Sequence, residues 1–283
     1  MNRSAARLLL ASGSVAISTS IGGTVLGSGL DAFFQLPQPS LAAGQRWVDA
    51  AGGNQHALGL TSSGRVLGWG VAALGLTSAP ALPPGTHYTR LGASTDNSGA
   101  LRSDGELVVW GDNTFGQCNV PARPAGTSYV DFSIGHTHTV AIRSDGQGLA
   151  FGGNVYGQLN IPPLPPGVRY VDVDCTQQRT LLLRSDGLLA GAGAAGPWLT
   201  FPASAPGLRY TEVAVDDTCC AALRSDGEVE TRAGNSLPPL PPGVVYVEIA
   251  AALSLIAARR SDGEVVIAYP SPLVVPPLLP GES

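Results

Sequence analysis

The sequence predicts an all-β fold built from repeated antiparallel sheets, on three observations. The chain of 283 residues contains 37 Gly and 23 Pro, which is a high content of turn-forming residues. A Ser-Asp-Gly tripeptide, preceded by a related Ser-Ser-Gly, recurs with its glycines 41, 41, 41, 40 and 36 residues apart, from Gly64 to Gly263. A second series of glycines, from Gly44 to Gly281, keeps nearly the same spacing. Repeats of about 40 residues made of short strands are typical of a β-propeller.

Each repeat begins with a predicted strand. When the glycine of the second series is counted as position 0, position 3 is aromatic in six repeats, positions 4 and 6 are mostly aliphatic, and position 5 is acidic in five. This alternation indicates a strand. The aromatic residues are Trp47, Tyr88, Tyr129, Tyr170, Tyr210 and Tyr246, and the acidic ones are Asp49, Asp131, Asp172, Glu212 and Glu248.

Two further strands follow in each repeat, joined by a tight turn. Residues 138–143 illustrate the second strand, and the Asp-Gly after it is a strong hairpin signal. Residues 106–111 illustrate the third strand, and residues 111–121 form a loop with a segment that ends in Pro. Because Pro cannot donate to a central ladder, we expect that segment to be an edge strand. The expected fold is therefore a seven-bladed β-propeller of four-stranded antiparallel blades.

The seven repeats fill residues 1–283 as a single domain. Arg3, Arg7 and the leucines after them resemble a weak secretory signal, but Ser, Gly and Thr interrupt the apolar stretch. A shift of 41 residues aligns residues 25–29 with residues 66–70, so we interpret the segment as a degenerate first blade beside the seventh in a closed ring. The expected units are approximately 3–43, 44–84, 85–125, 126–166, 167–206, 207–242 and 243–280.

The loop motifs resemble those of a known repeat family. The sequences Trp-Gly-Asp-Asn at 110–113 and Phe-Gly-Gly-Asn at 151–154, each followed by Gly-Gln, and the recurring Arg-Ser-Asp-Gly are similar to regulator of chromosome condensation repeats. The resemblance implies a seven-bladed propeller that binds other macromolecules. In the later repeats the Trp-Gly pair is replaced, as at Ala192-Gly193 and Arg232-Ala233, so we expect these blades to be less regular.

Composition excludes several classes of function. The net charge is −5 and all 16 basic residues are Arg, so we expect no nucleic-acid partner and no Lys-dependent chemistry. No run of 18 apolar residues is present, so we expect no membrane span, and the compartment stays open. The four cysteines lack metal-ligand spacing and are interpreted as small buried side chains. We expect no cofactor and a monomer.

Three sets of polar residues could carry chemistry: the histidines at position 12, His136, and two pairs of aspartates. We favour a structural role for each set. His56 and His138 both occupy position 12 of their repeats, which indicates a structural role that belongs to the repeat. His136 lies two residues from His138, a spacing found in metal sites, but no third ligand is near them in the sequence. The pairs Asp172 with Asp174 and Asp216 with Asp217 could act as acid and base or hold a cation. We also expect Tyr129 to stack on Arg143 and Tyr170 on Arg184 across the hairpin.

Chain direction predicts the binding face. Successive connections in an up-and-down blade alternate between the two faces of the disc, so the loops after the first and third strands share one face. These loops vary from repeat to repeat, and variable loops on a rigid scaffold are where specificity is built. We expect a non-catalytic scaffold that binds an unidentified protein there; the alternatives are a secreted polysaccharide enzyme or a guanine-nucleotide exchange factor. The candidate binding residues are Asp96, His136, Gln177, Gln178, Asp216, Asp217, Tyr156 and Trp198.

Overall fold

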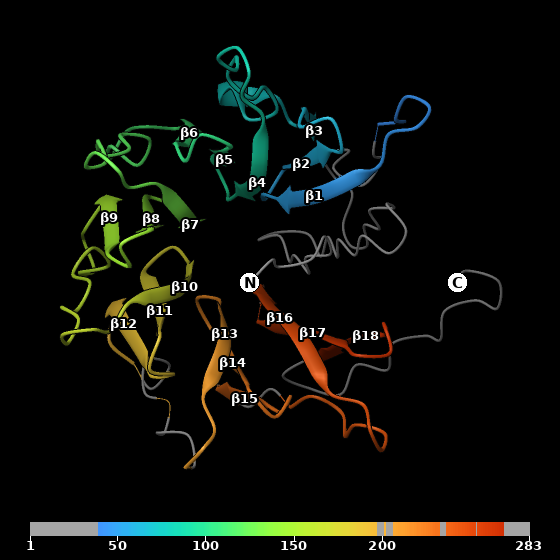
Figure 1. Ribbon diagram of the computed structural model, residues 1–283, viewed down its shortest axis with the longest axis vertical. Helices are drawn as coiled ribbons and strands as arrows, with labels where there is room; N and C mark the ends of the chain where they lie inside the picture. Colours follow the sequence, from blue (N-terminus) through green and yellow to red (C-terminus); the bar gives the residue numbers. More distant parts are fainter. Residues whose placement is uncertain (1–38, 197–200, 202–205, 233–235, 253, 269–283) are drawn as a thin grey trace.

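The described part of the protein is a ring of six antiparallel sheets, seen in a computed structural model (Figure 1). The structure describes residues 39–196, 201, 206–232, 236–252 and 254–268. The sheets follow one another round the ring in chain order, with the first strand of each nearest the centre. A wedge that no described element occupies separates the first sheet from the last. The expected unit 3–43 lies outside the described residues except for its final few.

Each of the six sheets has three strands in sequence order. The first three sheets are β1 (Trp47–Gly52), β2 (His56–Thr61) and β3 (Val66–Gly70); β4 (Tyr88–Ala93), β5 (Asn97–Arg102) and β6 (Leu107–Gly111); and β7 (Tyr129–Ile134), β8 (His138–Arg143) and β9 (Gly148–Gly152). The last three are β10 (Tyr170–Cys175), β11 (Arg179–Arg184) and β12 (Leu189–Gly193); β13 (Tyr210–Val215), β14 (Cys220–Arg224) and β15 (Val229–Arg232); and β16 (Tyr246–Ala252), β17 (Leu255–Arg260) and β18 (Val265–Ala268). A short 3-10 helix, η1 (Ala73–Gly75), follows β3.

The Ser-Asp-Gly turns close the hairpins as the sequence predicts. The glycine of each turn has a positive φ, such as +82° at Gly105 and +84° at Gly146, which favours glycine over any residue with a Cβ. The turn aspartate caps the backbone, since Asp145 Oδ1 accepts from the N–H of Gln147 at 3.1 Å. The same carboxylate forms an ion pair with the Arg143 guanidinium.

The expectation of a fourth strand is wrong for units 44–84, 85–125 and 126–166, whose residues are all described. None of the residues after the third strand in these units forms a strand. The proline carbonyls bond to a side chain instead of a ladder: Tyr129 Oη donates to Pro121 O and Tyr170 Oη to Pro162 O, both at 2.6 Å. The segment thus fastens one unit to the aromatic residue that opens the next.

Apolar side chains fill the space between consecutive sheets. In one cluster, Leu101 and Leu107 of one sheet pack with Tyr129 and Phe132 of the next. Equivalent clusters unite the other neighbouring sheets. Burial of each such side chain contributes about 1.5–3 kcal/mol, so the core of the ring lies between sheets.

A β-bulge in the first strand of every sheet changes the expected alternation. The register shifts between positions 3 and 5, as between Tyr170 and Asp172. Val171 is therefore turned outward and exposed, while Asp172 is buried. Asp172 Oδ2 accepts from the N–H of Val213 in the next sheet at 3.0 Å. Asp49 Oδ2 accepts likewise from Leu91 N–H at 2.7 Å. The acidic position thus links neighbouring sheets.

The expected stacking of tyrosine on arginine does not form. The predicted register is correct, because Tyr129 lies opposite Arg143 and Tyr170 opposite Arg184. However, the guanidinium groups turn away to the turn aspartates, as in the ion pair between Arg184 and Asp186. A forked guanidinium bonds a carboxylate with two donors, and this geometry competes with stacking on the ring.

The structural interpretation of the position-12 histidines is confirmed. His138 is fully buried, and its Nε2 lies 3.0 Å from Oγ1 of Thr180 in the next sheet. Because the Thr180 hydroxyl donates to Gln158 O at 2.9 Å, it accepts from His138, which places the ring proton on Nε2. His56 contacts Ser98 Oγ in the same way at 2.7 Å. Burial lowers the pKa of each histidine to about 4.

Replacing Asp172 by Ala should destabilise the fold by about 1–3 kcal/mol, because the buried N–H of Val213 loses its acceptor. Asp172→Asn keeps an acceptor oxygen and should therefore destabilise the fold less than Asp172→Ala does. Equilibrium unfolding in urea measures both effects. The neighbouring Val171→Ala is the matched control, and we expect it to change stability by less than about 0.5 kcal/mol. Equal unfolding midpoints for Asp172→Ala and Val171→Ala would show that the link adds no stability.

Stability should fall as the pH is lowered from 6.5 to about 4. In this window the unfolded chain protonates His56 and His138 while the folded state keeps them neutral, which costs about 3 kcal/mol for each histidine. The double variant His56→Asn and His138→Asn should flatten this dependence; Asn97 occupies the same position in its own repeat. Urea midpoints at several pH values test this, with the partly buried His136→Asn as control. An unchanged slope in the double variant would contradict the assignment.

Candidate functional site: the loop face and the central cavity

In the first four sheets, the loops after the first and third strands lie together and form the surface that we call the loop face. Asp112 N–H donates to Asp96 O at 2.8 Å, and Gly153 N–H donates to Thr137 O at 2.8 Å, so the two loops of a unit touch. The opposite surface, the hairpin face, carries the Ser-Asp-Gly turns and the links between units. There the N–H of Tyr129 donates to Gly105 O at 2.8 Å. The predicted division of connections between two faces is confirmed for the described units.

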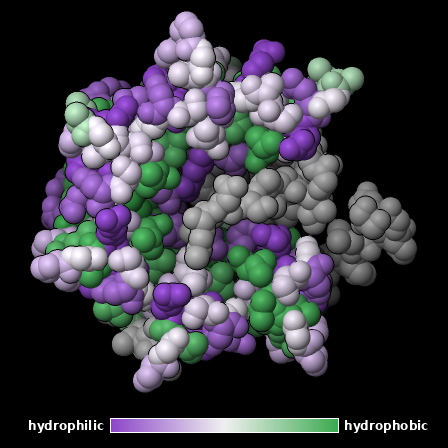
Figure 2. All heavy atoms as spheres, in the orientation of Figure 1, coloured by the Kyte–Doolittle hydropathy of each residue, from purple (hydrophilic) through white to green (hydrophobic). Residues whose placement is uncertain are grey.

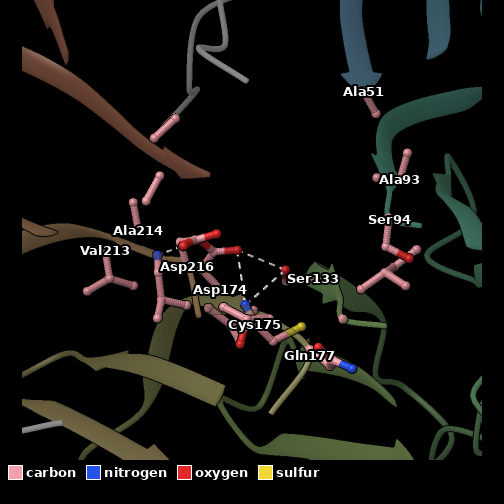
Figure 3. A pocket seen from close by; sticks show the side chains of 18 of the residues that line it. Ala51, Ala93, Ser94, Ser133, Asp174, Cys175, Gln177, Val213, Ala214 and Asp216 are labelled. Atoms are coloured by element: carbon pink, nitrogen blue, oxygen red, sulfur yellow. Dashed lines mark hydrogen bonds between the residues drawn. The ribbon is translucent and has the colours of Figure 1, made fainter. Parts of the chain in front are cut away.

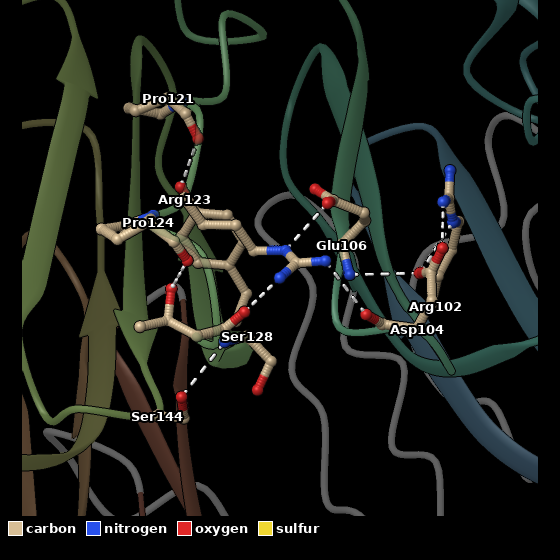
Figure 4. Close-up of polar contacts among 10 residues, drawn as sticks. Arg102, Asp104, Glu106, Pro121, Arg123, Pro124, Ser128 and Ser144 are labelled. Atoms are coloured by element: carbon tan, nitrogen blue, oxygen red, sulfur yellow. Dashed lines mark hydrogen bonds and ion pairs between the residues drawn. The ribbon is translucent and has the colours of Figure 1, made fainter.

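Polar contacts fasten the hairpin face within units 85–125 and 126–166, and a nitrogen of Arg123 joins the two units by donating to the Thr127 carbonyl (Figure 4). Arg123 Nε donates to Glu106 Oε1 at 2.8 Å, and a second nitrogen of the same guanidinium donates to Asp104 O at 3.3 Å. Ser128 N–H donates to Ser144 Oγ at 3.1 Å. These contacts stabilise the fold.

A cavity of about 370 Å³ lies where the first strands of the six sheets meet their following loops. The space-filling view shows both hydrophilic and hydrophobic residues along the inner border of the ring (Figure 2). Small side chains such as Ala51 and Ala93 line one part of the cavity, and polar side chains line another (Figure 3). The acidic side chains in the lining are Asp172, Asp174, Glu212, Asp216 and Asp217.

Asp174 joins three sheets at the cavity wall (Figure 3). Its Oδ1 accepts from Ser133 Oγ and from the N–H of Cys175, both at 3.0 Å. Its Oδ2 accepts from the N–H of Val215 at 2.9 Å. Both carboxylate oxygens therefore hold the backbone and side chains of the scaffold, which confirms the structural interpretation of Asp174. This arrangement does not suit a general acid or base.

The neighbouring carboxylates differ in how their oxygens are used. Asp216 Oδ1 accepts from the N–H groups of Thr218 at 3.1 Å and Ser254 at 3.2 Å. Asp217 Oδ1 accepts from Thr176 Oγ1 at 2.6 Å, whereas its Oδ2 has no partner among the described residues. Asp217 therefore offers a carboxylate oxygen to a ligand.

Ser94 supplies a second group without a partner. Its side chain lines the same cavity and is only 8% exposed. Its Oγ has no hydrogen-bond partner within the part of the chain that the structure describes. A buried hydroxyl left in this way costs free energy unless a ligand or water bonds it.

The predicted binding residues fall into four groups. His136, Gln177, Asp216 and Asp217 line the cavity together. Asp96 and Gln178 belong to the same loops but are not part of the lining, and Tyr156 lies on an outer loop. Trp198 lies outside the described residues. Sequence reasoning missed Ser133 and Glu212 at the cavity, although both stand in the first-strand repeat that could have indicated them.

The outer loops present apolar side chains at the rim of the loop face. Buried Gln117 and Gln158 hold these loops, because their Oε1 atoms accept from Phe115 N–H and Tyr156 N–H, each at 2.9 Å. The rings themselves are left 50% and 47% exposed. Val155, which precedes Tyr156 in sequence, and Leu74, on the outer loop of another unit, are also exposed, at 80% and 59%. We call the four residues Leu74, Phe115, Val155 and Tyr156 the rim cluster.

The thiols are poor nucleophiles at neutral pH. Cys175, Cys219 and Cys220 are buried, as the sequence predicts, whereas Cys118 is only partly buried; all four are free thiols. Burial raises the pKa of Cys118 and of Cys220 to about 11, so both stay protonated.

Among the described residues, no three His, Cys, Asp or Glu side chains are grouped so that they could hold a metal ion. The described residues also contain no helix of the length and apolarity that a membrane span needs.

Comparison with solved structures identifies the architecture. Human WBSCR16 is similar with a TM-score of 0.66 and 18% identity, over 90% of this chain and 86% of that chain. The CRINKLY WD40 ectodomain of the Arabidopsis thaliana receptor kinase ACR4 gives 0.67 and 16%, over 93% and 95%. Yeast RCC1 (Prp20), solved with Kap60 bound, gives 0.63 and 19%, over 78% and 69%. At these identities the likeness shows the fold.

The sequence motifs agree with that fold. A family model described as the regulator of chromosome condensation (RCC1) repeat matches residues 47–71 and 92–117, which include β1–β3 and the loop around Gln117. No curated protein sequence matches the chain. The resemblance seen in the loop motifs is thus confirmed for these two segments: the chain has a β-propeller fold and carries regulator of chromosome condensation (RCC1) repeats at residues 47–71 and 92–117.

Proposed function

We propose that this protein is a non-catalytic module that binds a protein partner on its loop face. The observation that carries the proposal is the rim cluster, whose large apolar side chains are exposed although the loops beneath them are firmly held. Exposed aromatic side chains on a rigid scaffold are the usual anchors of binding energy, and they lose little conformational entropy on binding.

The hairpin face is the weaker candidate. Its turns are nearly constant in sequence and are closed by arginine–aspartate ion pairs in five successive units. The exposed apolar residues near that face, such as Val130 and Val171, are bulge residues of the first strands, and they are smaller than the rings of the rim cluster. A face that repeats the same chemistry offers less specificity than one whose loops differ.

Two further observations support a protein partner. Yeast RCC1, which has a similar fold, has been solved with the protein Kap60 bound. The net charge of −5 without any Lys favours a protein over a nucleic acid. The polysaccharide-enzyme alternative receives no support, because Asp174 uses both carboxylate oxygens to hold the scaffold. No particular contact favours an exchange factor.

We also propose that residues 3–43 supply a seventh blade, the first in chain order, which closes the ring. The sequence register of 41 residues supports this assignment. So do the outward faces of the two end sheets: Trp47 and Ala50 form an apolar cluster on one, and Ala250 and Ala257 on the other. Neither cluster includes a described residue from another sheet. Apolar sheet faces on both sides of one wedge favour a further apolar unit between them.

The double variant Phe115→Ala and Tyr156→Ala should weaken partner binding at least about tenfold, because loss of two aromatic anchors removes more than ~1.4 kcal/mol. The partner is first identified by capture on the immobilised protein and mass spectrometry, and its affinity is then measured by calorimetry. Val130→Ala with Val171→Ala is the matched control, since it removes exposed apolar groups near the hairpin face. Loss of binding in the control but not in the rim variant would place the partner on the hairpin face.

Deletion of residues 1–38 should lower the urea midpoint and increase the binding of a hydrophobic dye. The reason is that the clusters around Trp47 and Ala257 would become exposed to water. The full chain serves as the reference in both measurements. A truncated protein with the same midpoint and dye binding as the full chain would contradict a seventh blade from this segment.

A further inference from the structure

The central cavity carries one sign of charge. Five carboxylates line it, and among the described residues no arginine side chain is part of the lining. Buried Arg179 lies behind this wall, where its guanidinium donates to the backbone carbonyl of Asp217. Acidic groups in a concave, partly enclosed site concentrate their field and attract cations.

Two oxygen atoms in this cavity lack a donor. Asp217 Oδ2 has no partner among the described residues, and Ser94 Oγ is buried without one. The two residues follow β13 and β4, which lie on different sides of the ring (Figure 1). A ligand with several N–H donors would satisfy such acceptors, and a carboxylate bonded by a cation makes the stronger hydrogen bond.

We infer that the mouth of the central cavity binds an arginine side chain of the protein partner. The inference rests on the proposed function and names the chemistry of its partner. A cavity of about 370 Å³ is near the lower end of the ~300–1,000 Å³ typical of ligand pockets, so it suits a side chain and not a folded element. A guanidinium has five donors, keeps its charge and is more weakly hydrated than an ammonium, which favours it in a partly enclosed site.

A bare metal ion fits the site less well. The oxygens of Asp174 are occupied by Ser133, Cys175 and Val215, and Asp216 Oδ1 is occupied by two backbone N–H groups. No group of three potential metal ligands is present in the described part of the chain. A guanidinium can bond a single available carboxylate oxygen such as Asp217 Oδ2, whereas a metal ion needs several ligands within one coordination sphere.

The test uses the full-length protein and a fluorescent peptide, acetyl-Gly-Arg-Gly-Arg-Gly-amide, with its citrulline analogue as the uncharged match. We expect the arginine peptide to bind, the citrulline peptide to bind at least tenfold more weakly, and the affinity to fall as NaCl rises. Asp217→Asn should weaken binding at least fivefold. Asp104→Asn removes the same charge on the hairpin face and should leave binding unchanged.

A second variant covers the case in which Asp217→Asn fails to fold. Thr95→Arg adds a cation at the cavity lining without removing a described hydrogen bond, and it should abolish peptide binding. Equal binding of the two peptides, equal effects of Asp217→Asn and Asp104→Asn, or no binding at about 1 mM would overturn the inference. So would one-to-one displacement of the peptide by Mg²⁺, which would identify a metal site.

The peptide assay separates this inference from the proposed function. The rim variant Phe115→Ala with Tyr156→Ala should leave peptide binding unchanged, because neither residue lines the cavity. If the rim variant loses the partner while the peptide never binds, the loop face is correct and the arginine pocket is wrong. If the peptide binds at Asp217 while the rim variant keeps the partner, the pocket is correct and the rim cluster is not the anchor.

Discussion

The innermost strands of the ring have a backbone edge without a partner strand, and the rest of the fold depends on how that edge is satisfied. Each first strand bonds to the second strand of its own sheet on one side only. On its other side, backbone N–H groups donate to carboxylates of the preceding sheet. The N–H groups of Leu91, Val213 and Val215 donate to Asp49, Asp172 and Asp174, respectively. An edge buried without such acceptors would cost free energy at every unit.

The carboxylates that accept hydrogen bonds from this strand edge also explain the shape of each unit. The bulge before position 5 turns the acidic side chain toward the neighbouring sheet and leaves the residue before it, such as Val171, at the surface. Farther out, the histidine at position 12 contacts a hydroxyl of the next unit, and that hydroxyl bonds the carbonyl of a loop glutamine. Carboxylates therefore join successive units near the centre, and hydrogen bonds through His138 join two of them farther out. Apolar side chains fill the space between neighbouring sheets.

This rigid frame leaves the loop face free to vary. The outer loops are fixed from below by buried glutamines, so their apolar tips need not contribute to folding and remain exposed. At the centre, most of the acidic groups that line the cavity hold the scaffold, whereas Asp217 keeps an oxygen for a ligand. Binding and folding thus use different atoms of the same repeat.

The sequence by itself determined the period, the hairpins, the register of Tyr129 against Arg143, the division into two faces and the structural role of the histidines, because these follow from local turn chemistry and a repeated spacing. It did not determine the missing fourth strand in the described units, the bulge or the ion pairs that displaced the expected ring stacking. It also grouped Tyr156 with Asp216, which the structure separates. Tertiary structure decided these features, because each depends on which acceptor of the next unit lies within reach of a side chain.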